Sequence, residues 1–151
     1  MIGLRPAVLS YAAKPCPAAP GYILELPFIN AEIPAGFPSP AEHYLVEPLD
    51  ISGFLVRRPK ATYFMPAVGD SMVEAGINNG DLLVIDRAED VKNGSIVVAR
   101  IGDEFTVKRF CLIDGLPFLC SENEKYKPIE ITEETDFEIW GCVTFAITSL
   151  R

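Results

Sequence analysis

Histidine is almost absent from this chain, which has only His43 among its 151 residues. Cysteine is also scarce, and no Cys-x-x-Cys pair occurs among Cys16, Cys111, Cys120 and Cys142. Zinc sites are built from clustered Cys and His ligands, so the sequence predicts no metal site, and we expect no other cofactor. Free cysteines are typical of a reducing compartment, which indicates a cytoplasmic protein.

Positive charge and long apolar runs are lacking too. The chain has 13 Lys and Arg against 21 Asp and Glu, a formal net charge of -8, and residues 1–35 contribute none of it. An acidic body repels phosphate backbones, so we expect no direct sequence-specific DNA binding and consider a basic protein partner more plausible. No apolar run approaches the about 20 residues that span a bilayer, so no membrane partner is expected.

Proline is abundant at the start of the chain, where eight of the 13 prolines lie within residues 1–40. Proline has no amide donor and restricts the preceding residue, which disfavours long helices and central strands. We therefore predict an extended arm over residues 1–38, with its apolar part at 22–29 as a short edge strand. Short helices are expected from the capping box at 39–42 and over residues 50–56.

The pattern changes to strands from residue 62 onward. Runs rich in β-branched and aromatic residues occupy 62–68, 81–87, 95–101, 104–113 and 137–150, with shorter runs in "LPFLC" and "IEIT" between them. Short strands separated by turns are typical of an all-β domain. We predict a mostly β fold, a compact curled or barrel-like domain that follows the proline-rich N-terminal arm. The length suits one domain with a substantial core but hardly two.

Ser71 lies in the glycine-flanked turn "VGDSMVEAG", just after a predicted strand, where a nucleophile would be displayed. A serine hydroxyl needs a base that takes its proton. His43 is the first candidate, but its neighbours Glu42 and Tyr44 suggest no partner that would orient the imidazole. A surface histidine without a catalytic role is therefore the favoured interpretation.

A lysine is the alternative base, because Ser-Lys pairs are a known variant of the nucleophile–base arrangement. An ordinary lysine has a pKa of about 10.4, so its deprotonation at pH 7 costs about 4.6 kcal/mol, and burial can lower the pKa by the about 3–5 units required. Only Lys108 is embedded in a strand, in "EFTVKRF". The other five lie in the arm, turns or loops: Lys14, Lys60, Lys92, Lys125 and Lys127. Without further evidence, the favoured interpretation is that "GDSM" is an ordinary turn and Lys108 a charge that protects an edge strand.

A resemblance favours the catalytic interpretation. "GFPSPAEHY", "ATYF", "GDSM", "GDLLVID", "DEFTVKRF" and "YKPI" occur in an order and at spacings that resemble the LexA/UmuD-type self-cleaving serine peptidases, peptidase S24, over about residues 34–151. The resemblance implies that Ser71 is the nucleophile and Lys108 the general base. It also implies an oxyanion hole formed by the backbone amides of Asp70 and Ser71.

The same resemblance places the cleaved bond at Ala35–Gly36, in "PAGFPSP". Small residues on both sides of the bond suit a protease without a large substrate pocket, and an extended segment can lie along a sheet edge. A tethered substrate has a high effective concentration, so a weakly complementary site suffices. Taken alone, Ala-Gly could be a flexible hinge. Cleavage would divide the chain into an arm, 1–35, and a β-rich peptidase-like domain, 36–151.

The function that the resemblance implies belongs to the bacterial SOS response to DNA damage. A RecA–single-stranded DNA filament would stimulate self-cleavage, and the processed form, a homodimer, would serve an error-prone Y-family translesion DNA polymerase of the UmuC type. Thirty-five proline-rich residues cannot hold the DNA-binding domain of a repressor. Two alternatives are a protein-binding module of the same fold that no longer cleaves and a signal-peptidase-like Ser-Lys processing protease.

Overall fold

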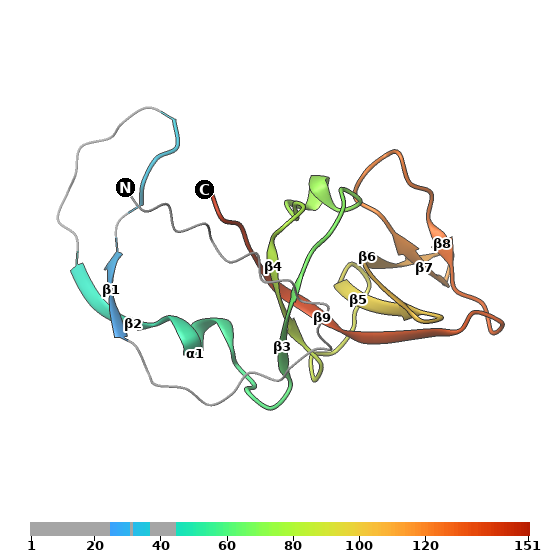
Figure 1. Cartoon of the computed structure of the whole chain (residues 1–151), viewed down its shortest axis with the longest axis horizontal. Helices are drawn as coiled ribbons and strands as arrows, with labels where there is room; N and C mark the ends of the chain where they lie inside the picture. Colours follow the sequence, from blue (N-terminus) through green and yellow to red (C-terminus); the bar gives the residue numbers. More distant parts are fainter. Residues whose placement is uncertain (1–24, 31, 37–44) are drawn as a thin grey trace, which may run out of the picture.

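The structure, a computed structural model, describes residues 25–30, 32–36 and 45–151 (Figure 1). His43, the capping box at 39–42 and Cys16 therefore lie outside the described residues. Among the described residues the fold is mostly β, as predicted, with antiparallel pairing in both of its sheets.

The larger sheet has seven strands in the order β3-β4-β9-β5-β6-β7-β8. Their bounds are β3 Thr62–Pro66, β4 Leu82–Asp86, β5 Ile96–Ile101, β6 Glu104–Ile113, β7 Leu116–Cys120, β8 Ile129–Glu130 and β9 Phe137–Ile147. Each of these strands overlaps a run that the sequence predicted.

The sheet is not closed, so the barrel-like part of the prediction is wrong. β3 and β8 are the two ends of the strand order and do not pair with each other. Closure would require these two edge strands to pair, and β8 offers only two residues against five in β3. The fold is a twisted, open sheet, and the turn that carries Ser71 connects β3 to β4 (Figure 1).

Two apolar clusters pack on the sheet. One contains Met72, Leu83, Ile85 and Val98, and the other contains Val97, Ala99, Leu119 and Cys142. Val97 and Val98 are adjacent on β5, and adjacent residues of a strand point to opposite faces, so the clusters lie on opposite faces of that strand. Because Met72 directly follows Ser71, the first cluster anchors the turn that carries the serine.

A separate two-stranded ribbon precedes the larger sheet. β1 Glu25–Asn30 pairs with β2 Leu45–Asp50, and α1 Ile51–Leu55 lies between this ribbon and the seven-stranded sheet (Figure 1). β1 and α1 agree with the expected strand at 22–29 and helix at 50–56, whereas β2 was not predicted. Pro27 and Pro48 face each other across the ribbon, and proline is tolerated in these strands because each has a free edge.

Some features are missing from the described part of the chain. No helix there is long and apolar enough to cross a membrane. No group of three or more His, Cys, Asp or Glu side chains in the same residues could hold a metal ion. Cys111, Cys120 and Cys142 are free thiols.

Candidate active site

The turn that carries Ser71 is fixed by backbone hydrogen bonds at its base. The amide of Ala67 donates to the carbonyl of Asp81 at 2.8 Å, and the amide of Gly80 donates back to the carbonyl of Ala67 at 2.8 Å. Gly69 has φ of 95°, a conformation that side chains disfavour, and its amide donates to Asn79 Oδ1 at 2.9 Å. The glycine of "GDSM" is thus the residue that lets the chain turn into the serine.

Core packing and one short helix hold the other side of the turn. Met72 is 3% exposed and packs into the first apolar cluster. The 3₁₀ helix η1 Val73–Ala75 follows and ends at Gly76, which adopts the left-handed conformation. Ser71, between the glycine turn and the buried methionine, stays partly accessible. The sequence therefore folds so that the hydroxyl is displayed on a rigid support.

Lys108 lies in the middle of β6, opposite Val97 of β5. The residue is 8% exposed, and this burial lowers the pKa of its ammonium below the ordinary lysine value. Its Nζ lies 2.8 Å from Ser71 Oγ and 3.2 Å from the carbonyl oxygen of Val107. The structure thus brings together two predicted site residues that are 37 positions apart.

The geometry of this pair suits proton transfer. A charged ammonium has three donors, and two of them are directed at Ser71 Oγ and the Val107 carbonyl. A neutral amine can keep the bond to Val107 and accept the Ser71 hydroxyl with its free lone pair. The distance of 2.8 Å lies within the range expected between a nucleophile and its base.

Two amides beside the serine are available for an anion. Among the described residues, no acceptor is found for the backbone N–H of Asp70 or of Ser71. The peptide carbonyl of Asp70 is held by Asn123 Nδ2 at 2.9 Å, and that of Ser71 by the amide of Glu122 at 2.8 Å. Free, preorientated N–H groups beside a nucleophile are what an oxyanion hole requires.

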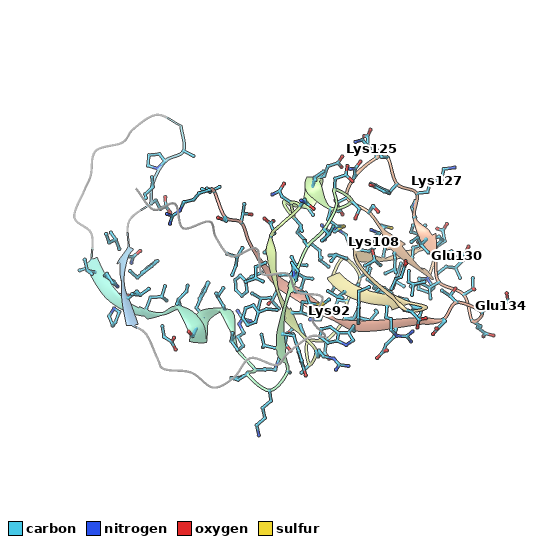
Figure 2. The ribbon with its side chains drawn as sticks, viewed as in Figure 1. Lys92, Lys108, Lys125, Lys127, Glu130 and Glu134 are labelled. Carbon is cyan, nitrogen blue, oxygen red and sulfur yellow. The ribbon has the colours of Figure 1, made fainter. Side chains whose placement is uncertain are left out.

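The other described lysines are poorly placed to act as the base. Figure 2 shows Lys108 within the sheet, whereas Lys125 and Lys127 lie on the outer loop between β7 and β8. The Lys125 side chain is 76% exposed and pairs with Asp70 Oδ2 at 3.5 Å. A solvated lysine keeps its proton at neutral pH, so Lys108 is the described lysine that combines burial with contact to the serine.

One small cavity adjoins the serine, and a second cavity adjoins the first. The first, of about 50 Å³, is lined by Ser71 and by seven further residues: Ala67, Val68, Gly69, Met72, Ile77, Thr106 and Val107. The second, of about 180 Å³, shares Ala67, Val68, Thr106 and Val107 with the first and extends to Met65 and Phe105. The part at the nucleophile is small and mainly polar, and the adjoining part is larger and mainly apolar.

Comparison with known proteins places the chain in a family. Residues 27–144 match the Peptidase S24-like family. The chain belongs to this family. Its members are self-cleaving serine peptidases of the LexA/UmuD type, so the chain is a serine peptidase by family. The match covers most of the ribbon and nearly all of the seven-stranded sheet.

Individual S24 relatives are similar over much of the chain. Protein SamA of Salmonella typhimurium is 45% identical over 125 residues, which cover 83% of this chain and 86% of SamA. Protein MucA of Escherichia coli is 43% identical over 123 residues, 81% of this chain and 84% of MucA. The LexA repressor of Albidiferax ferrireducens is 42% identical over 118 residues, which cover 78% of this chain but 52% of the repressor.

The structure does not bring the predicted cleavage bond to the S24 dyad. Ala35 and Gly36 form an exposed bend, and neither lines the cavities beside Ser71. A Cβ added at Gly36 would meet nothing within 4 Å. The segment 32–36 lies near the ribbon and away from the seven-stranded sheet (Figure 1). The bond is thus accessible and undocked.

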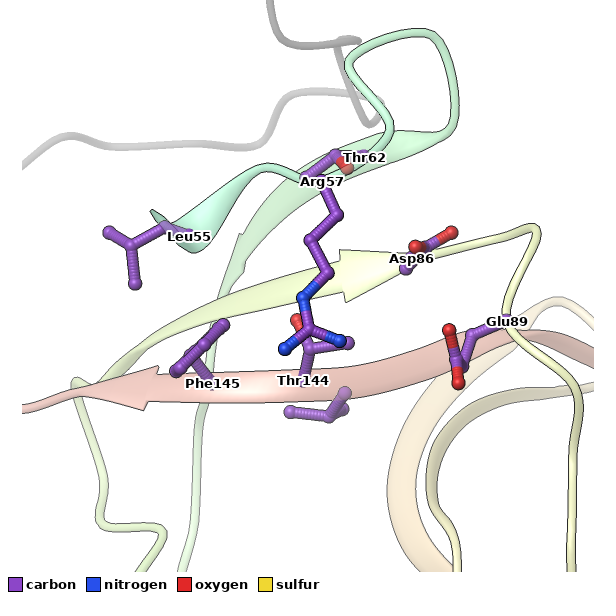
Figure 3. Close-up of a pocket in the computed structure, with 8 residues that line it drawn as sticks. Leu55, Arg57, Thr62, Asp86, Glu89, Thr144 and Phe145 are labelled. Carbon is purple, nitrogen blue, oxygen red and sulfur yellow. The ribbon is translucent and has the colours of Figure 1, made fainter. Parts of the chain in front are cut away.

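A cavity of about 270 Å³ elsewhere in the molecule lacks peptidase chemistry (Figure 3). It is lined by residues of α1, β3, β4 and β9 and of the segments that follow α1 and β4, and Arg57 extends into it. Its two hydroxyl groups are both engaged, because Thr62 donates to the Arg58 carbonyl at 2.8 Å and Thr144 to the Val84 carbonyl at 3.2 Å. No nucleophile is free among the residues that line this cavity.

The sequence did not identify the residues that contact the dyad from the β7–β8 loop. Asn123 holds the Asp70 carbonyl, Tyr126 Oη donates to Asp70 Oδ1 at 2.5 Å, and the Tyr126 ring lies 5.9 Å from Lys108 Nζ. The "YKPI" motif contains Tyr126 and contributed to the family resemblance, but no role was assigned to it. This motif was the feature of the sequence from which a role for the β7–β8 loop could have been predicted.

Proposed function

We propose that the chain is an SOS mutagenesis protein that cuts itself once, at Ala35–Gly36, with Ser71 as nucleophile and Lys108 as general base. The observation that carries the proposal is the 2.8 Å contact between Lys108 Nζ and Ser71 Oγ at a buried position of an S24 chain. Cleavage releases the arm, 1–35, and leaves the working form, 36–151.

The reaction follows from the geometry once Lys108 is neutral. Lys108 Nζ takes the hydroxyl proton of Ser71, and Oγ attacks the carbonyl carbon of Ala35, whose oxygen takes up negative charge between the amides of Asp70 and Ser71. The C–N bond to Gly36 then breaks, and the new amino group receives the proton from Lys108. Water hydrolyses the resulting Ala35 ester of Ser71, which regenerates the serine.

The cavities beside Ser71 support Ala35–Gly36 as the bond. A cavity of about 50 Å³ accommodates the methyl group of Ala35 but no long side chain. In an extended segment, side chains two residues apart share a face, so Ile33 faces the adjoining cavity of about 180 Å³ when Ala35 occupies the first. Ile33 is 92% exposed in the undocked arm, and burial of its side chain favours docking.

The lengths of the matches favour a mutagenesis protein over a repressor. SamA and MucA align with this chain over 86% and 84% of their own lengths, whereas about half of the LexA repressor is covered. By this likeness, and by the resemblance to UmuD, the processed form is a homodimer that serves a UmuC-type Y-family polymerase in translesion synthesis. The acidic body favours contact with proteins over contact with DNA.

The stimulus is tested by incubating the purified chain with a RecA filament assembled on single-stranded DNA with a non-hydrolysable ATP analogue. We expect the filament to raise the rate of self-cleavage by about 5- to 150-fold at neutral pH, the factor by which a coupling free energy of about 1–3 kcal/mol changes the docking equilibrium of the arm. Intact-mass spectrometry follows the products 1–35 and 36–151.

Two controls make this experiment specific. RecA without DNA leaves cleavage at its basal rate, and the Ser71→Ala variant stays uncut with the complete filament. A chain that cuts at the same rate with and without the filament refutes the SOS part of the proposal and retains the peptidase. A Ser71→Ala variant that is cut by the filament preparation reveals a contaminating protease.

A further inference from the structure

The β7–β8 loop holds the backbone of the nucleophile turn. The amide of Glu122 donates to the Ser71 carbonyl at 2.8 Å, and Asn123 Nδ2 donates to the Asp70 carbonyl at 2.9 Å. A peptide unit is planar, so the direction of the Asp70 carbonyl fixes the direction of the Ser71 N–H in the same unit. The loop therefore orients one of the two amides that the proposed mechanism uses for the oxyanion.

Tyr126 adds a contact to the side chain of the same turn. Its Oη donates to Asp70 Oδ1 at 2.5 Å, and Lys125 Nζ lies 3.5 Å from the other carboxylate oxygen. The hydrogen bond from Tyr126 lowers the pKa of Asp70, and the same bond raises the pKa of Tyr126. Asp70 is thus a carboxylate at neutral pH, held by a phenol that stays protonated.

The ring of Tyr126 contacts the general base. Lys108 Nζ lies 5.9 Å from the ring centroid, within the distance at which an aromatic face attracts a cation. This attraction exists for the ammonium and is lost for the neutral amine, so it favours the protonated form. It opposes the effect of burial, which disfavours the charge.

Few other charged groups surround Lys108 among the described residues. β5 presents the apolar Val97 opposite it, and the turn presents Asp70, which is engaged by Tyr126 and Lys125. On the other side, Glu122 of the loop is paired with Arg109 of β6. The ring of Tyr126 is therefore the aromatic contact that offsets the burial of the Lys108 ammonium.

We propose that Tyr126 is a positioning residue of the self-cleavage site with two separable actions. Its hydroxyl holds the Asp70–Ser71 turn in the orientation that cleavage needs, and its ring keeps Lys108 protonated at neutral pH and so restrains the uninduced reaction. The inference rests on the proposed Ser71–Lys108 chemistry. It makes the β7–β8 loop a point at which a bound partner could change the rate, by moving one side chain.

Two substitutions separate the actions. Tyr126→Phe removes the hydroxyl and keeps the ring, and Tyr126→Leu removes both. We expect the phenylalanine variant to cleave about tenfold more slowly at every pH, because it loses a hydrogen bond to a charged group, with an unchanged inflection of the pH–rate profile. From phenylalanine to leucine, the inflection moves down by about half a pH unit, because the cation–π attraction is lost.

A substitution at another tyrosine and the constant charge of Asp70 separate the role of the Tyr126 ring from other effects. Tyr63→Phe is the same substitution at a ring that packs on Trp140 with centroids 5.0 Å apart, outside this loop, and it leaves the cleavage rate unchanged. Asp70 is a carboxylate at neutral pH with or without the Tyr126 hydrogen bond, so loss of the hydroxyl leaves its charge unchanged and does not produce the downward shift expected for loss of the ring. Both Tyr126 variants lose the hydrogen bond to Asp70, and only the leucine variant also loses the ring. The difference between the two variants therefore measures the effect of the ring on Lys108.

A second measurement does not need cleavage. In chains that carry Ser71→Ala, the Lys108 pKa is obtained from the pH dependence of its side-chain ¹³Cε NMR signal, with tyrosine, phenylalanine or leucine at position 126. The expected result is equal pKa values for tyrosine and phenylalanine and a value about half a unit lower for leucine. Equal values for all three residues refute the role of the ring, whether or not the wild-type chain cuts itself.

The outcomes also distinguish this inference from the proposed function. Wild-type protein that stays uncut at every pH, with and without the RecA filament, together with the expected NMR shift, refutes the proposed self-cleavage and supports the role of the ring. A phenylalanine variant that cuts at the wild-type rate refutes the role of the hydroxyl. Leucine and phenylalanine variants with the same inflection in an active enzyme refute the role of the ring.

Discussion

Replacement of Lys108 with methionine abolishes self-cleavage and leaves the fold intact. The lysine is 8% exposed and contacts Ser71 Oγ at 2.8 Å, so the variant loses the group that takes the hydroxyl proton. General-base catalysis contributes about 10²–10⁴-fold, and we expect the rate to fall by about 10³-fold. Methionine fills a similar volume and removes a charge that is costly to bury, so unfolding in urea should occur at the same or a higher concentration.

The matched control is Lys92→Met, the same substitution in the exposed turn between β4 and β5. This variant should cut at the wild-type rate, which shows that loss of one positive charge is not the cause. The cleavage rate is measured by intact-mass spectrometry at a pH near 10, where the wild-type reaction is fastest. A Lys108→Met chain that keeps more than about a tenth of the wild-type rate would remove lysine from the mechanism.

Replacement of Ala35 with phenylalanine blocks cleavage almost completely. The cavity beside Ser71 has a volume of about 50 Å³ and is lined by the buried residues Ala67, Met72 and Ile77, which belong to the core and cannot move aside cheaply. Forcing a large side chain into a packed core costs about 1–3 kcal/mol, occasionally more. The phenylalanine also moves the carbonyl of residue 35 away from Ser71 Oγ, which lowers the rate further. We therefore expect the cleavage rate to fall by about 10²-fold or more.

Ala35→Ser is the size-matched control, because its side chain exceeds that of alanine by one oxygen atom. It should cut within about threefold of the wild-type rate, a change that corresponds to less than about 1 kcal/mol. The two variants do not change the seven-stranded sheet, since Ala35 is exposed in the undocked arm. Normal processing of Ala35→Phe would place the scissile bond elsewhere in the chain.

The sequence predicted most of the strands because their signals are local. Each strand of the larger sheet overlaps a run of β-branched and aromatic residues, and β6 has the predicted bounds, Glu104–Ile113. β2 was missed because a helix was expected from the capping box at 39–42 and because proline, here Pro48, disfavours central strands, whereas a two-stranded ribbon tolerates proline at its free edges. The open sheet was missed because closure depends on the pairing of the edge strands β3 and β8, which no local pattern reports.

The Ser71–Lys108 pair was predicted without coordinates, from an elimination among the lysines together with the resemblance to a known family. A base that must lose its proton near neutral pH has to be buried, and Lys108 is the lysine embedded in a strand. The loop contacts could not be found in the same way. Asn123 and Tyr126 reach Asp70 across 53 and 56 positions, and the path of the loop between β7 and β8 is set by tertiary packing.

In this conformation the predicted scissile bond lies apart from the Ser71–Lys108 pair. Ala35 and Gly36 lie in an exposed bend, while Ser71 and Lys108 are already in contact. A preformed dyad with a distant substrate segment is what a peptidase regulated by docking requires. Docking of the arm at the cavities beside Ser71 is then an unfavourable equilibrium that precedes the proposed chemistry, and a RecA filament would shift that equilibrium.

The most direct test of the account is intact-mass spectrometry of the purified wild-type chain, incubated without any partner near pH 7 and near pH 10. Burial lowers the pKa of Lys108, and below that pKa each pH unit raises the neutral fraction about tenfold. The account predicts two products, residues 1–35 and 36–151, which form much faster at the higher pH. Cleavage at another bond, or a rate that does not change between the two pH values, would contradict it.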